Sequence, residues 1–267
     1  MIRYVTVIIL VFVAQFSRAD TLRMAVTTSF DNSGLANVLL PEISSDLDID
    51  VQLLVVGTGQ ALRLGAAGDV DAVLVHSKAA EEAFVREGHG THRREIMYND
   101  FVVIGPVSDV ANIANAHSVL DAMQRVYVTQ SLFVSRGDES GTHIAELKIW
   151  DAADLNVDNF GSWYRSVGTG MGAALNTAVG MEAYVLSDRA SWLNFGNKKG
   201  LKLLYSGDQL LHNQYAYLPV HPGKNTAIRH DLALVLENWL TSPRASALIN
   251  GYMISGEKLF TFNALNN

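Results

Sequence analysis

The stretch that decides the fold is VQLLVVGTGQALRLGAAGDVDAVLV, residues 51–75. Residues 51–56 and 71–75 are apolar apart from Gln52 and Asp71 and have the length of buried strands. The segment between them opens on a Gly-Thr-Gly turn and has the composition of a helix that ends near Gly68. Two apolar strands joined through a helix predict parallel strands of one sheet. Because these strands do not alternate polar and apolar residues, we expect helices on both faces of that sheet.

The same alternation of strands and helices extends in both directions along the chain, and Gly105-Pro106 ends a strand where the chain can leave one lobe for another. The other expected strands are residues 21–26, 100–106, 132–135, 201–205 and 214–220, and the other expected helices are residues 35–40 (ended by Pro41), 81–88, 142–152, 172–178 and 228–240. We therefore predict an α/β protein of two lobes joined by two chain crossings. Lobe I would hold residues 20–104 plus 215–267, lobe II residues 105–214, and ligands would bind in the cleft between them.

Residues 1–19 predict a signal peptide. Arg3 precedes an apolar run over residues 5–14, and the small residues Ser17 and Ala19 come just before the expected cleavage point. The run is about half the roughly 20 residues that a membrane span needs, which argues against an anchoring helix. We expect export to the periplasm with cleavage after Ala19.

Composition excludes several classes of function. The 267-residue chain has a net charge of −7, and loss of residues 1–19, which hold two arginines and no acid, would leave −9. Such a chain is repelled by nucleic acid and by anionic membranes. It contains no cysteine, so neither disulfides nor thiolate metal sites can form, and its eight histidines show no metal-ligand spacing. We expect no cofactor and no bound metal, and we interpret His76 as a surface or packing residue.

Four polar turns share one chemistry, since each places glycine, serine or threonine where a strand gives way to a helix. They are TTS (27–29), VGTGQAL (56–62), SRGDESGT (135–142) and VGTGMGAAL (167–175). A helix start offers unpaired backbone N–H groups and the positive end of the helix dipole. Glycine lets a ligand approach that backbone, and hydroxyl groups add uncharged donors. Four such turns together predict a cradle for a small anion.

Other interpretations of these turns stay open on the residues alone. Serine and threonine before a helix are usually caps that bind no ligand. Ser140 and His143 are close enough in sequence to serve a secreted serine-type hydrolase, although GDESG lacks the spacing of the hydrolase nucleophile turn. Arg136-Gly137-Asp138 has the form of an adhesion signal. Arg136 is also the one basic residue within these turns apart from Arg63, and its guanidinium has forked donors that suit an oxyanion.

The chain resembles the periplasmic tungstate-binding proteins of ABC transporters, the TupA-like group. The motifs that carry the resemblance are TTSFDNSGL (27–35), VGTGQAL.LG..GD.DAVLVH (56–76), MYNDFVVIGP (97–106), FVSRGDESGTH (133–143), GTGMGAAL (168–175) and AYVLSDRASW (183–192). They cover almost the whole chain after residue 20, in order. The resemblance implies the type II periplasmic-binding-protein fold and non-covalent capture of a tetrahedral oxyanion in the cleft.

The resemblance also implies which residues bind the anion. They are Thr27, Thr28, Ser29, Thr58, Gly59, Arg136, Ser140, Gly141, Thr142, Gly170 and Met171. The family usually opens this region with Thr-Thr-Thr-Ser, whereas this chain has Val26 in the first position, which offers no hydroxyl donor. We expect a monomeric, non-enzymatic receptor that passes tungstate to a membrane permease. Molybdate, sulfate and phosphate remain alternative ligands, because these anions are also tetrahedral and differ little from tungstate in size.

Overall fold

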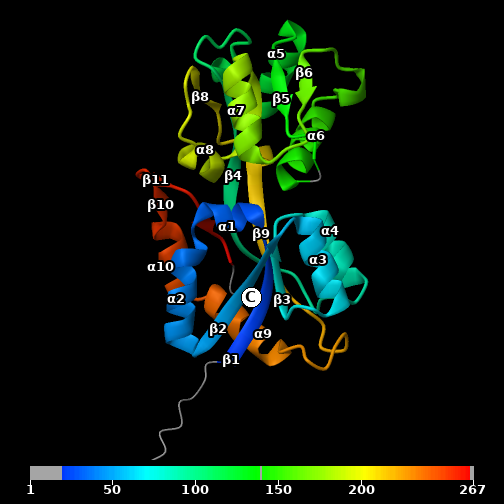
Figure 1. Ribbon diagram of the computed structural model, residues 1–267, viewed down its shortest axis with the longest axis vertical. Coiled ribbons are helices and arrows are strands. Elements are labelled where there is room, and N and C mark those ends of the chain that lie inside the picture. Colours follow the sequence, from blue (N-terminus) through cyan, green and yellow to red (C-terminus); the bar gives the residue numbers. More distant parts are fainter. Residues whose placement is uncertain (1–19, 139, 265–267) are drawn as a thin grey trace, which may run out of the picture.

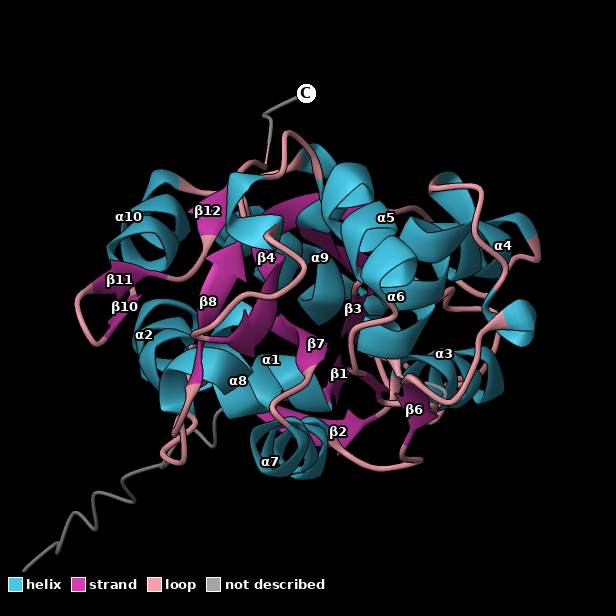
Figure 2. Cartoon of the chain, turned by 90° about the horizontal axis from the view of Figure 1, so that it is seen from above, coloured by secondary structure: helices cyan, strands magenta, loops and turns pink. Residues whose placement is uncertain are grey.

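The computed structural model describes residues 20–138 and 140–264 and shows two α/β lobes, one above the other in Figure 1. The expected signal peptide, residues 1–19, lies outside the described residues. We call the lower lobe in Figure 1, built around β1, β2 and β3, lobe I, and the upper lobe, built around β5, β6 and β7, lobe II. Seen from above, helices surround the strands (Figure 2). The predicted two-lobed α/β fold is confirmed.

Lobe I contains a mixed sheet with the strand order β2-β1-β3-β9-β4. The strands β1, β2 and β3 are parallel, and β9 and β4 run antiparallel to their neighbours. Its strands are β1 (Asp20–Thr27), β2 (Ile49–Val56), β3 (Ala72–Val75), β4 (Arg94–Pro106), β9 (His212–Pro219), β10 (Met253–Ile254), β11 (Glu257–Lys258) and β12 (Thr261–Phe262). Its helices are α1 (Thr28–Ser33), α2 (Ala36–Leu47), α3 (Thr58–Ala67), α4 (Lys78–Arg86), α9 (His230–Leu240) and α10 (Pro243–Gly251).

The predicted burial of both faces holds for β3 and for the end of β1, but not for the edge strand β2, where Asp50, Gln52 and Val55 are exposed. Met24 of β1 packs into a core with α2, α9 and α10. The next residue, Ala25, faces the other side and packs into a second core with α3 and α4. Successive strand residues point to opposite faces, so a strand covered on both sides must be apolar at every position.

Lobe II contains a second parallel trio with the order β7-β5-β6. Its strands are β5 (Phe133–Ser135), β6 (Tyr164–Ser166), β7 (Tyr184–Asp188) and β8 (Leu201–Tyr205). Its helices are α5 (Val119–Thr129), α6 (Gly141–Ala152), α7 (Met171–Met181) and α8 (Arg189–Asn194), with short 3-10 turns η1 (Ile113–Asn115), η2 (Val157–Asn159) and η3 (Gln209–Leu211).

Strand β4 belongs to both lobes. Its first half, residues 94–100, pairs with β9, and residues 101–104 pair with β7. At the changeover, the Arg189 guanidinium of α8 binds the Asp100 carboxylate through Nε at 2.7 Å and Nη2 at 2.6 Å. Such a forked pair has fixed geometry, so it holds the start of α8 against the strand that crosses between the lobes.

The structure differs from the sequence prediction at Pro41. We expected this proline to end a helix, but α2 continues through it to Leu47. Proline lacks an N–H and therefore costs the helix one backbone hydrogen bond. Leu39 and Ile43, two positions before and after Pro41, are buried in the lobe I core, and their burial offsets this cost.

Lobe II is held together by a cluster of aromatic side chains around Trp150 of α6. Trp150 is 0% exposed, and its ring lies 5.2 Å from Phe133 and 5.1 Å from Phe160, measured between ring centroids. Its Nε1 donates to Glu146 Oε1 at 3.3 Å. Edge-to-face rings of this kind add to the free energy gained from burial.

Replacing Trp150 should therefore destabilise the protein strongly. We expect Trp150→Ala to lower the free energy of unfolding by about 3–5 kcal/mol, because it removes buried area and leaves a cavity. Urea denaturation followed by circular dichroism measures this change. Val128→Ala is the control, since Val128 is 78% exposed and should change stability by less than about 0.5 kcal/mol. Equal effects of the two substitutions would contradict the role of this cluster.

Candidate functional site

The polar turns of lobe I lie together because parallel strands end at one edge of the sheet. In the register of β1 and β2, Thr27 is opposite Val56, so the turn that starts α3 is adjacent to the turn that starts α1. Strand β3 is parallel to β1 on its other side and is followed directly by His76. The edge therefore presents the turns at Thr27 and Thr58, together with His76.

Lobe II repeats this arrangement. Ser135 of β5 is opposite Ser166 of β6, which places the SRGD turn next to the Gly-Thr-Gly turn before α7. The two turns are joined by a hydrogen bond from Arg136 Nε to the Thr169 carbonyl, 3.3 Å long. Strand β7, parallel to β5, ends at Asp188, which occupies in lobe II the place that His76 holds in lobe I. Figure 1 shows α1, α3, α6 and α7 next to the boundary between the lobes.

The four helix starts are of two kinds. Thr27 and Ser140 cap α1 and α6, since their hydroxyl oxygens accept from the backbone N–H of Phe30 and His143. By contrast, the cap positions before α3 and α7 are Gly57 and Gly170, where the described chain provides no side-chain cap. The first N–H groups of a helix have no partner within it. The two glycine starts are thus the better anion cradles.

Ser29 is the centre of a hydroxyl network in lobe I. Its Oγ lies 2.9 Å from Thr27 Oγ1, 3.0 Å from His76 Nε2 and 3.1 Å from the Tyr215 hydroxyl. The rings of His76 and Tyr215 lie 4.9 Å apart between centroids. Burial of the imidazole lowers the pKa of His76 to about 4, with a smaller opposing effect from Asn213. This part of the site therefore presents neutral groups at physiological pH.

Arg136 supplies a cation at the lobe II edge and is itself paired. Its side chain is 16% exposed, and its Nη2 lies 2.5 Å from Asp138 Oδ2. Asp138 Oδ1 also accepts from the Ser140 N–H at 3.2 Å. Burial alone would raise the pKa of Asp138, but the hydrogen bonds from Ser140 and the Arg136 charge outweigh it and lower that pKa. Asp138 thus both orients Arg136 and caps the turn.

A second carboxylate, Asp188, lies close enough to sense the Arg136 charge. Its side chain is buried, and it accepts from the Ser191 N–H at 2.8 Å as the cap of α8. Burial raises the pKa of Asp188, and the hydrogen bonds from Ser191 and the charge of Arg136 offset this only in part. A dianion bound beside it would raise that pKa further.

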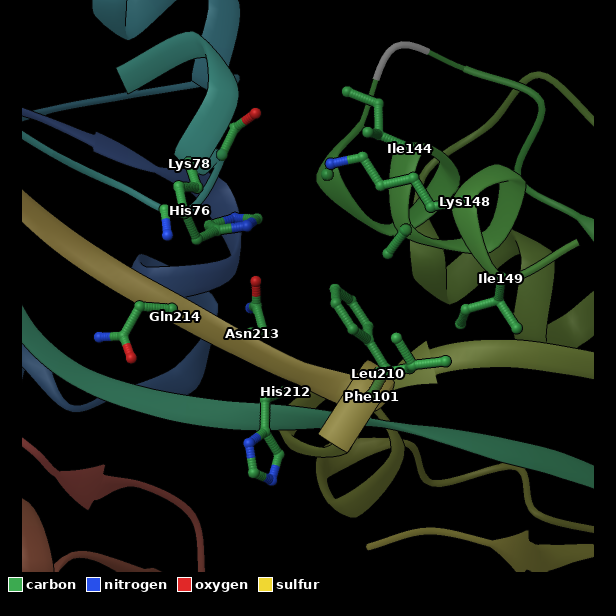
Figure 3. A pocket seen from close by; sticks show the side chains of 13 residues that line it. His76, Lys78, Phe101, Ile144, Lys148, Ile149, Leu210, His212, Asn213 and Gln214 are labelled. Carbon is green, nitrogen blue, oxygen red and sulfur yellow. The ribbon is translucent and has the colours of Figure 1, made fainter. Parts of the chain in front are cut away.

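The two lobes come into contact where Gly141 of α6 meets His76. A Cβ atom built on Gly141 would lie 2.3 Å from His76 Cε1, far inside van der Waals contact. Beside this contact is a cavity of about 300 Å³ between the lobes (Figure 3). His76, Lys78 and Asn213 line it together with Lys148 of lobe II, and no acidic residue is among its lining residues. Of the four turns, only Gly141 contributes to this cavity.

Ser140 and His143 are not arranged as a catalytic serine–histidine pair. Ser140 Oγ is used to cap the backbone N–H of His143. The His143 ring turns away from Ser140, with Nδ1 3.1 Å from Ser135 Oγ and 3.8 Å from Glu146 Oε2. Neither is Arg136-Gly137-Asp138 displayed for adhesion, because Arg136 is mostly buried and held by Asp138 and Thr169.

The predicted ligand residues are thus placed unequally. Thr27 and Thr142 are buried, Ser29, Ser140 and Arg136 are partly buried, and Gly141 lies at the contact between the lobes. Thr28, Gly59 and Gly170 are exposed at their turns, while Thr58 and Met171 are buried as the first residues of α3 and α7. Sequence reasoning missed three residues, His76, Asn213 and Tyr215. Only His76 gave a signal, since it follows the carboxyl end of a buried strand.

The fold and site define a two-lobed binding protein, and comparison with known proteins gives its family. The model of the PBP superfamily domain matches residues 14–244. A tungstate-binding protein TupA from Peptoclostridium acidaminophilum is 41% identical over 245 residues, which are 90% of this chain and 85% of the relative. The chain belongs to the PBP superfamily and, within it, to the TupA family.

Two solved structures agree with this assignment. The tungstate-binding protein TupA from Desulfovibrio alaskensis G20 is 40% identical with a TM-score of 0.87, and the match covers 92% of this chain and 100% of that one. The tungstate ABC transporter protein from Geobacter sulfurreducens is 41% identical with a TM-score of 0.79, covering 87% and 98%. A further solved structure, 37% identical, is described as a domain of a periplasmic protein from Wolinella succinogenes.

Within the described residues, no helix is both long and apolar enough to cross a membrane. The same part of the chain holds no group of three histidine or acidic side chains arranged to bind a metal ion. The donors that the described residues present at this edge are N–H groups, hydroxyl groups and the Arg136 guanidinium.

The two histidines near the lobe contact, His76 and His143, have pKa values shifted in opposite directions. The His76 pKa lies near 4, below the ordinary 6.5, because its ring is buried. The His143 pKa is raised above 6.5, chiefly by its interaction with Glu146. Neutral His76 therefore stabilises the fold above about pH 6.5, and this contribution is lost as pH falls toward 4. Charged His143 stabilises the fold below about pH 6.5, and this is lost as pH rises through its folded pKa.

A pH titration of the histidine ring signals by NMR measures both values. Glu146→Gln is the control for His143, since removal of the carboxylate should lower that pKa and leave the pKa of His76 unchanged. Equal midpoints for the two rings would contradict the assigned environments.

Proposed function

We propose that this protein is an extracytoplasmic receptor that captures tungstate in the cleft between its lobes and delivers it to the membrane permease of an ABC transporter. The observation that carries the proposal is the arrangement of four donor-rich turns at the carboxyl edges of two parallel trios, with Arg136 beside them. Tungstate is a tetrahedral dianion whose four oxygens accept hydrogen bonds only. The relatives described as tungstate-binding proteins span nearly the whole chain.

The proposed binding set is the one the family resemblance implies, with the glycine starts of α3 and α7 as its main backbone donors.

We further propose export through a signal peptide at residues 1–19, periplasmic location and a monomeric state. The lobe boundaries would fall where the crossing strands leave each sheet, with residues 20–104 plus 215–267 in one lobe and 105–214 in the other. The change of β4 from pairing with β9 to pairing with β7 after residue 100 supports this division.

Tungstate should raise the thermal stability of the protein, because a ligand that binds only the folded state stabilises it by mass action. At a tungstate concentration of about 100 Kd the gain is about 2.7 kcal/mol, which corresponds to roughly 5–10 °C in melting temperature for a chain of this size. Differential scanning calorimetry with and without micromolar tungstate tests this. An unchanged melting temperature would overturn the proposed function.

Anion selectivity is tested in the same protein by calorimetric competition. Molybdate, sulfate and phosphate are titrated against the tungstate complex, and we expect none of the three to displace tungstate at equal concentration. Tighter binding of molybdate, sulfate or phosphate would keep the receptor function and reassign its ligand.

Arg136→Ala should weaken tungstate binding by more than about tenfold, since a hydrogen bond to a charged group contributes roughly 1.5–3 kcal/mol. Arg86→Ala is the matched control. It removes the same charge from the exposed end of α4 and should leave the affinity nearly unchanged. Isothermal titration calorimetry measures both. Equal affinities of Arg136→Ala and the wild type would assign Arg136 a structural role only.

A further inference from the structure

His76 lies at the meeting point of the two lobes. It follows the last residue of β3 and projects toward the cavity that Ile144 and Lys148 of α6 line from the other lobe (Figure 3). Asn213 of the crossing strand β9 lies next to it in the same cavity. The His76 side chain of lobe I therefore lies beside the crossing strand β9 and faces lobe II.

The contact with Gly141 depends on glycine. Because a Cβ at this position would lie 2.3 Å from His76 Cε1 and 3.0 Å from Nδ1, an alanine there would push α6 and the imidazole apart. Gly141 is the first residue of α6, directly after the cap Ser140. The start of α6 can therefore approach the edge of the His76 ring this closely only because residue 141 is glycine.

His76 also controls the direction of the Ser29 hydroxyl. A serine hydroxyl has one proton to donate and two lone pairs that accept. Its three neighbours are Thr27 Oγ1, His76 Nε2 and the Tyr215 hydroxyl. If His76 Nε2 lacks a proton, Ser29 must donate to it and has none for an anion. If Nε2 carries the proton, His76 and Tyr215 can fill both lone pairs, and the Ser29 proton is available to Thr27 Oγ1, 2.9 Å away, or to an incoming anion.

We propose that His76 is a positioning residue of the anion site, which directs the Ser29 hydroxyl toward the bound oxyanion and sets how closely α6 approaches lobe I. The inference rests on the proposed function and deepens it. In the complex the imidazole is neutral with its proton on Nε2. Ser29 of lobe I and Gly141 of lobe II are thereby coupled, because both lie against the same imidazole ring.

Burial keeps this ring neutral under working conditions, since it lowers the pKa of His76 to about 4. Its titratable neighbours are Tyr215, whose ring packs against it, and Lys78, Lys148 and His212, which line the same cavity. None of these is an acid that would favour a charged imidazole.

The test uses two substitutions at His76 that differ in one respect. His76→Gln places an amide N–H near the position of Nε2, whereas His76→Leu keeps the volume and removes the donor. We expect His76→Leu to lower tungstate affinity by more than about tenfold and His76→Gln to stay within about threefold of the wild type, following the usual contribution of a hydrogen bond to a charged group. Equal affinities for wild type and His76→Leu would overturn the role of His76.

A second matched pair of variants tests how closely the lobes approach at Gly141. Gly141→Ala should weaken tungstate binding and reduce the compaction that small-angle X-ray scattering detects on binding. Gly180→Ala is the control, because a Cβ there meets nothing within 4 Å. Equal behaviour of the two alanine variants would overturn the steric part of the inference.

The tautomer can be read in the unmodified protein, so the result does not depend on how a variant folds. Nitrogen-15 NMR of the tungstate complex should show the His76 proton on Nε2, and a proton on Nδ1 would overturn the hydrogen-bond part. These outcomes can be distinguished from failure of the proposed function. If the proposed function is wrong, the wild-type protein does not bind tungstate. If only the proposed role of His76 is wrong, the wild-type protein still binds it.

Discussion

Strand β4 runs through both lobes, and its pairing fixes the position of every polar turn. It pairs with β9 in lobe I and with β7 in lobe II. Strand β9 also borders β3, and β7 also borders β5, so each parallel trio is anchored to the same strand. The helix starts that follow these strands therefore meet at one boundary. The forked Arg189–Asp100 pair at the changeover limits how far the lobes can shift along β4.

Much of this architecture could be predicted from the sequence, because it depends on local patterns. Apolar strands of five or six residues and a Gly-Thr-Gly turn identify the parallel trio of lobe I without knowledge of its packing. In lobe II only β5 was expected, because β6 is three residues long and partly exposed, and β7 was also missed. Pro41 shows the limit of this reasoning, since the buried residues on either side keep α2 helical through it. Helix propensity is a local property, whereas the burial that outweighs it is set by the tertiary structure.

The site could be predicted only at the level of its turns. Whether a hydroxyl caps its own helix or faces a ligand depends on its rotamer, and Thr27 and Ser140 turn out to be caps. His76 was missed because its role comes from Gly141, which lies 65 positions later in the chain and reaches it only after the lobes assemble. Asn213 and Tyr215 join it from β9, for the same reason. Contacts between distant segments leave no mark in local spacing.

The charges around the boundary are balanced in a way that suits a dianion in an acidic protein. Arg136 is already neutralised by Asp138, so its pair contributes direction more than net charge. At the equivalent strand ends, burial holds the pKa of His76 low and that of Asp188 high, which favours the neutral form of each. The negative charge of a bound anion would then be met mainly by N–H and O–H dipoles. Dipoles act over short distances, so their effect depends on spacing, and the glycine that lets α6 rest on His76 becomes part of the binding chemistry.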